Sequence, residues 1–169
     1  MSAKKLAVLA VFTATALLMH FIESLLPGLS PVPGIKLGLA NIVTVVLMAA
    51  MSRRDAGLVL LARILLGGIF SGRGVGLIYS AAGGAMSFAV CALLILWLSE
   101  KQLWALSVAG AVGHIIGQLA AAALVMGSFS VFAYAPLLTA SAMAGGLFTG
   151  LCAQFLLAKI KKLGISFPS

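Results

Sequence analysis

Six long apolar segments, separated by short breaks of glycine, proline and charged residues, constrain this chain more than any other feature of its sequence. A helix needs about 20 residues to cross roughly 30 Å of hydrocarbon. The segments lack the alternation of strands, and only helices or closed barrels satisfy their backbone in lipid, so helices are favoured. The second and third segments are short for a full crossing. The predicted spans are residues 6–26, 35–51, 56–70, 75–98, 103–126 and 134–158.

The composition of the chain excludes a soluble domain. Of the 169 residues, 63% are apolar and 8% are charged, whereas an ordinary soluble domain has about 25% charged residues. We therefore expect an all-α integral membrane protein, a six-transmembrane-helix bundle that forms a single domain over residues 1–169. The first apolar run continues past the small-residue triplet Ala14-Thr15-Ala16, so we expect a retained helix rather than a cleaved signal peptide.

The distribution of lysine and arginine predicts how the bundle is oriented. If both termini are cytoplasmic, eight cations fall on the inner side, two on the outer side and one, Arg63, within the third span. The positive-inside rule then predicts a multi-pass protein of the plasma membrane with both termini in the cytoplasm. This topology explains the net charge of +8 without a nucleic-acid partner, which would need a soluble basic face. The inner cations are Lys4, Lys5, Arg53, Arg54, Lys101, Lys159, Lys161 and Lys162.

Polar residues of the predicted spans gather in the half of the bundle that this orientation places outside. His20 and Glu23 are three residues apart and share one face of the first span. Charged groups in a membrane are costly and usually face a cavity or a partner. The N-terminal ends of the second, fourth and sixth spans also point outward, where they attract anions. The candidate binding residues are His20, Glu23, Lys36, Asn41, Arg63, Arg73, Tyr79, His114 and Gln118.

These positions predict an outward-facing pocket for a small anionic ligand, such as a carboxylate, a phosphate or a diphosphate. Three simpler interpretations stay open. Arg63 can pair with Glu23 as a structural bridge, and His114 and Gln118 can hydrogen-bond between helices. The two outer cations can be solvated loop residues. The clustering of all these groups on one side of the bundle favours the pocket.

Four segments of the chain resemble the Gx transporter family, which is also labelled heptaprenyl diphosphate synthase component I. They read PGIKLGLANIVTV, ARILLGGIFSG, YSAAGGAMS and VAGAVGHIIGQL, and the resemblance extends from Pro33 through the sixth span. The family is similar in size and span number to the substrate-binding S components of energy-coupling factor importers. The resemblance therefore implies a protein that captures a small nutrient or cofactor precursor from outside the cell.

The same resemblance implies protein partners. S components dock on a transmembrane coupling subunit that two cytoplasmic ATPases drive, and their docking face often carries small residues with AxxxA spacing on the first helix. Small residues at this spacing favour close contact between helices in general. The residues that match it in this chain are Ala3, Ala7, Ala10 and Ala14.

The acidic residues test the synthase label. Prenyl synthases hold magnesium with two aspartate-rich clusters, whereas this chain has three acidic residues in total, Glu23, Asp55 and Glu100. We therefore expect no enzyme activity, no catalytic residue, no metal site and no cofactor. The GxxxxGK[ST] phosphate loop is absent from the sequence, so ATP hydrolysis would belong to a partner. Two alternatives stay open. One is a non-catalytic membrane subunit linked to polyprenyl diphosphate or quinone metabolism. The other is a proton-coupled carrier that uses His20, Glu23 and His114.

Overall fold

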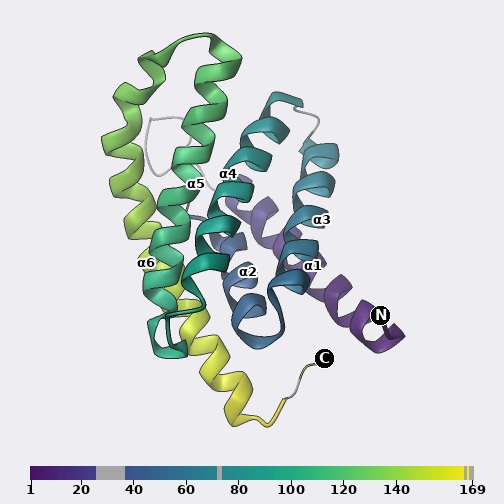
Figure 1. Cartoon of the computed structure of the whole chain (residues 1–169). Helices are drawn as coiled ribbons and strands as arrows, with labels where there is room; N and C mark the ends of the chain where they lie inside the picture. Colours follow the sequence, from purple (N-terminus) through teal and green to yellow (C-terminus); the bar gives the residue numbers. More distant parts are fainter. Residues whose placement is uncertain (26–36, 72–73, 166, 168–169) are drawn as a thin grey trace.

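The computed structural model describes residues 1–25, 37–71, 74–165 and 167, which form six α-helices and two short 3-10 helices (Figure 1). The all-α fold predicted from the sequence is confirmed for these residues. The α-helices are α1 (Ala3–Leu25), α2 (Leu39–Ala50), α3 (Arg53–Ser71), α4 (Gly74–Leu94), α5 (Leu103–Met126) and α6 (Ala135–Lys162). The 3-10 helices are η1 (Glu100–Gln102), before α5, and η2 (Phe129–Tyr134), before α6.

Four of the described helical segments are long and apolar enough to cross a membrane: α1, α4, α5 together with η1, and α6 together with η2. The chain is therefore a multi-pass membrane protein. The prediction of six full crossings is not met by the other two helices. The 12 residues of α2 reach only about 18 Å at 1.5 Å per residue. Helix α3 begins with Arg53, Arg54 and Asp55 and also contains Arg63, and these charges lower its hydropathy.

Successive helices run in opposite directions, so that both termini lie at the same end of the bundle as the α2–α3 and α4–α5 turns (Figure 1). All eight cations that the sequence assigned to the inner side belong to this end, because they lie at the start of α1, the start of α3, in η1 and at the end of α6. We call it the basic end. The structure thus groups these cations as predicted, and their cytoplasmic location stays a prediction.

Helix α2 lies in the interior of the bundle. Seven of its 12 residues are buried, and they include Val46 and Leu47, which are 1% and 0% exposed. A helix with this share of buried residues is surrounded by other helices rather than facing lipid on one side. Helix α2 is therefore a short central helix that the longer helices surround.

Glycines allow α5 to approach its two neighbours closely. A Cβ atom added at Gly150 of α6 would lie 2.5 Å from the Cα of Trp104 and 2.7 Å from the Cβ of Ser107 on α5. Gly117 of α5 lies equally close to the backbone of Ala82 on α4. Between α5 and α6 the hydroxyls of Ser107 and Thr149 are 3.0 Å apart and hydrogen-bonded. In lipid, such close packing and interhelical hydrogen bonds replace the hydrophobic effect as the source of helix association.

A buried charge cluster joins α1 to the α2–α3 turn at the basic end. The Nζ of Lys5 lies 3.1 Å from Oδ2 of Asp55, and the Ser52 hydroxyl donates to the same carboxylate oxygen at 2.6 Å. Asp55 is 4% exposed. Burial alone would raise the pKa of Asp55, but the Ser52 hydroxyl and the Lys5 ammonium outweigh it and hold the pKa below its usual value of 3.8.

The first prediction concerns the glycine contacts. Gly150→Ala is expected to lower the free energy of unfolding by about 1–3 kcal/mol, because the new methyl group meets backbone that cannot yield without separating α5 from α6. Thermal unfolding in detergent measures the effect. Gly74→Ala is the matched control, since a Cβ there meets nothing within 4 Å. Equal melting temperatures for the two variants would contradict the account.

The second prediction concerns Asp55. Because its pKa is lower in the folded than in the unfolded state, its stabilising effect is full above about pH 4 and is lost as the pH falls through the lower folded pKa. Asp55→Asn is therefore expected to melt below the wild type at pH 7, and the difference is expected to shrink as the pH is lowered toward about 3. A difference that is independent of pH would show that the carboxylate charge does not contribute.

Candidate functional site

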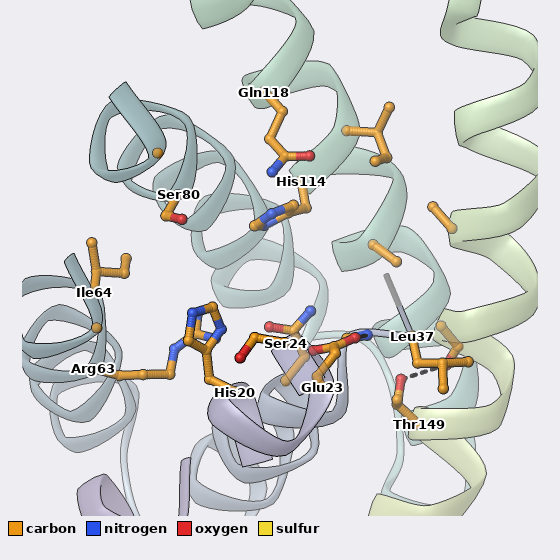
Figure 2. Close-up of a pocket in the computed structure, with 18 of the residues that line it drawn as sticks. His20, Glu23, Ser24, Leu37, Arg63, Ile64, Ser80, His114, Gln118 and Thr149 are labelled. Carbon is orange, nitrogen blue, oxygen red and sulfur yellow. Dashed lines mark hydrogen bonds between the residues drawn. The ribbon is translucent and has the colours of Figure 1, made fainter. Parts of the chain in front are cut away.

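A cavity of about 440 Å³ lies between the helices, and residues of all six α-helices line it. It is formed by the C-terminal parts of α1 and α3, the N-terminal parts of α2 and α4, and the middle of α5 and α6 (Figure 2). It therefore lies toward the end of the bundle opposite the basic end. Its volume falls within the range of small-molecule sites, about 300–1,000 Å³.

Six of the nine binding residues predicted from the sequence line this cavity, although they come from four different helices. Tyr79 is not among the lining residues, whereas Ser80 is, because it follows Gly76 by one helical turn and shares its face. Lys36 and Arg73 lie outside the described residues. The six predicted residues that line the cavity are His20, Glu23, Asn41, Arg63, His114 and Gln118.

Three further polar residues, Ser24, Ser80 and Thr149, line the cavity and were not predicted to do so. Ser24 is adjacent to Glu23 in the sequence, and Ser80 lies one turn from Gly76, so helical periodicity gives a signal for both. Thr149 gives none, because counting residues along the sixth span places it in the inner half of the membrane. Only the packing of α6 on α5 brings it to the cavity.

Glycines on neighbouring helices make room for the polar side chains. A Cβ at Gly83 of α4 would lie 2.8 Å from the ring of His114 and 2.8 Å from Cγ of Gln118. A Cβ at Gly67 of α3 would touch the ring of His20, at 3.6 Å from Cδ2. A side chain at Gly83 would therefore displace His114 and Gln118, whereas His20 packs at ordinary contact distance over Gly67.

Arg63 is the buried cation of the cavity. It is 9% exposed, and its Nε has no hydrogen-bond partner among the described residues. Figure 2 shows its side chain extending from α3 toward His20 of α1. A buried donor without an acceptor costs free energy, and a guanidinium at this depth is especially costly. The site thus contains a buried cation with at least one donor that no described residue accepts from.

The structure does not contain the structural bridge between Arg63 and Glu23 that was one interpretation of the sequence. Among the described residues, side chains within 4.0 Å form ion pairs at Lys5–Asp55 and Lys161–Glu100 only. Arg63 and Glu23 interact electrostatically over a longer distance.

The Glu23 carboxylate binds the N-terminus of α2. Its Oε1 accepts a hydrogen bond from the backbone N–H of Gly38, the N-cap of α2. Gly38 adopts a φ of 75°, a conformation that glycine accepts readily and that turns its N–H toward α1. The partial positive charge of a helix N-terminus stabilises a carboxylate at this position. The group bound at the start of α2 is thus a carboxylate of the protein itself.

A second, smaller cavity of about 20 Å³ adjoins the first, and Asn41 lines both. Its other polar lining residues are Thr44, Ser87 and Ser107. This volume is enough for about one water molecule. Ser107 also hydrogen-bonds to Thr149, which lines the main cavity, so polar residues of α2, α4, α5 and α6 connect the two cavities.

The residues that line the main cavity suit binding by charge and hydrogen bonds. They offer one guanidinium, one carboxylate, two imidazoles, two amides and several hydroxyls, with apolar side chains such as Leu77 and Ile115 between them. Within the described part of the chain, no group of three or more His, Cys, Asp or Glu residues is placed to hold a metal ion. The two carboxylates of the basic end, Asp55 and Glu100, are engaged by lysines.

The sequence of this chain is similar to that of a known protein family. Residues 12–156 match the family described as heptaprenyl diphosphate synthase component I. No curated protein and no solved structure matches the chain. The matched region contains every residue that lines the main cavity. It also contains the four segments that resembled the family in the sequence. The chain belongs to the heptaprenyl diphosphate synthase component I family.

Proposed function

We propose that the protein is the substrate-binding membrane subunit of an importer of the energy-coupling factor type, and that it captures a small anionic nutrient or cofactor precursor. The observation that carries this proposal is Arg63, a buried cation, 9% exposed, that lines a cavity of about 440 Å³ and forms no ion pair within 4.0 Å among the described residues. A carboxylate or phosphate would fill its donors, because the guanidinium fork matches the oxygen geometry of either group.

The topology supports capture from outside the cell. The eight cations of the basic end belong in the cytoplasm by the positive-inside rule, and the cavity lies toward the opposite end. A ligand from the extracellular side would therefore reach the cavity without crossing the core of the bundle.

The surface of α1 supports docking on a coupling subunit. Ala3, Ala7, Ala10 and Ala14 are all exposed and follow one another at spacings of four, three and four residues, which places them on one face. Leu9 and Ala16, which are 5% and 1% exposed, lie on the opposite face of α1, against the bundle. The small residues thus form a smooth outer stripe that a partner helix could approach closely. ATP hydrolysis would take place on separate cytoplasmic subunits.

A non-catalytic role in polyprenyl diphosphate or quinone metabolism is the second candidate, and the description of the family favours it. The apolar side chains of the cavity would suit a prenyl group. Against it, a diphosphate needs several cations, and Arg63 is the single Lys or Arg among the described lining residues. A proton-coupled carrier is the third candidate, since His20, Glu23 and His114 all line the same cavity. In each case we propose binding or transport rather than catalysis.

The third prediction tests the role of Arg63. Arg63→Gln is expected to reduce affinity for the small molecule that co-purifies with the wild type by well over tenfold, since a desolvated charged contact contributes about 2–5 kcal/mol. Its melting temperature without ligand is expected to stay near that of the wild type. Arg54→Gln, at the basic end, is the control and should bind normally. Equal affinity for all three proteins would contradict the proposal.

The fourth prediction tests the docking stripe. The double substitution Ala10→Leu and Ala14→Leu is expected to weaken association with the coupling subunit while leaving ligand binding intact, because larger side chains prevent close helix approach. Ala140→Leu with Ala144→Leu is the matched control, since both alanines are exposed one turn apart on α6. Co-purification of the ATPase subunits gives the readout. Equal recovery with both double variants would place the docking face elsewhere.

A further inference from the structure

The main cavity contains an anion and a cation that do not pair with each other. The Glu23 carboxylate accepts from the N–H of Gly38 at the start of α2, while Arg63 forms no ion pair within 4.0 Å in the described part of the chain. Both side chains line the same cavity, and in the view of Figure 2 Glu23 lies between Arg63 and Leu37, the residue before Gly38. The cavity therefore provides two separate positions for a negative charge, and one carboxylate occupies only the first.

We infer that Glu23 is an internal stand-in for the anionic group of the ligand, and that a carboxylate or phosphate of the ligand displaces it from the N-terminus of α2. This inference rests on the proposed function. A ligand anion that lies between Gly38 and Arg63 would take both the helix N-terminus and the buried guanidinium. Glu23 contacts only the helix N-terminus. The ligand anion would contact both groups, so it forms one charge-assisted contact, with Arg63, that Glu23 lacks.

The positions of the two side chains make this exchange feasible. Glu23 is half-buried, near the C-terminal end of α1, so its carboxylate can turn toward the mouth of the cavity and regain water. Arg63 is 9% exposed in the middle of α3 and cannot do the same. The mobile partner of the exchange is therefore the carboxylate, and the fixed partners are the guanidinium and the N-terminus of α2.

Such a stand-in would act on specificity. When no ligand is bound, the Glu23 carboxylate accepts from the N–H of Gly38 at the start of α2. This hydrogen bond stabilises the empty bundle. A neutral molecule cannot compete with the carboxylate for this position, whereas an anion can. The apparent affinity for an anion is lowered by the fraction of molecules in which Glu23 holds the site. Glu23 is then a specificity-determining residue that selects for a negatively charged group.

Acetate is a suitable probe, because it carries the proposed anionic group and little else. Thermal melting of the full chain in detergent is measured against sodium acetate concentration at constant ionic strength. Glu23→Gln is expected to lower the half-saturating acetate concentration about tenfold, the size of effect that one lost hydrogen bond to a charged group produces. Glu100→Gln removes the same charge at the basic end and is expected to behave like the wild type.

Two further variants separate the possible outcomes. Glu23→Asp keeps the negative charge but shortens the side chain, so it reaches Gly38 less well and is expected to strengthen acetate binding as well. If Glu23→Asp binds acetate only as well as the wild type, Glu23 acts through charge repulsion alone, and the stand-in role is overturned. Unchanged or weaker binding to Glu23→Gln would overturn it too, as would the absence of any acetate response in both proteins. Arg63→Gln is expected to abolish the response. If Arg63→Gln abolishes the acetate response while Glu23→Gln leaves it unchanged, the proposal of an anion site at Arg63 is kept and only the stand-in role of Glu23 is overturned.

Discussion

A guanidinium in the middle of a membrane bundle has to be solvated by protein, water or ligand, and the organisation of this molecule follows from that requirement at Arg63. The residue sits on α3, one of the two helices that lack the length or apolarity of a full crossing. Longer helices surround it and close a cavity of about 440 Å³ over it. The protein leaves its Nε without an acceptor among the described residues. Under the proposed function, a ligand anion compensates the cost of this buried guanidinium.

The rest of the bundle supports this site by close packing. Gly83 makes room for His114 and Gln118, and Gly150 lets α6 approach α5 near the hydrogen bond between Ser107 and Thr149. The basic end is closed by different means, through the buried Lys5–Asp55 pair and the exposed Lys161–Glu100 pair. Among the described residues, the basic end thus contains both ion pairs, whereas polar groups converge on a cavity toward the other end.

Much of this arrangement could be predicted from the sequence, because the signals were strong and local. Apolar length and the breaks between runs predicted the helices, and the depth of polar residues predicted six that line the cavity. The contact between Glu23 and Gly38 could not be predicted, since a backbone N–H has no signature in the sequence and the two residues are 15 positions apart. The choice of Ser80 over Tyr79 depends on helix rotation, and the position of Thr149 depends on how α6 packs.

Native mass spectrometry of the wild-type protein, purified under mild conditions from its own host, tests most directly whether the cavity holds an anion. The account predicts a retained small molecule that carries a carboxylate or phosphate and fits a cavity of about 440 Å³. Its release should leave the bundle folded, with Glu23 on the N-terminus of α2. Retention of only neutral or cationic small molecules, with no anion bound at any ligand concentration tested, would contradict the assignment of the cavity as an anion site.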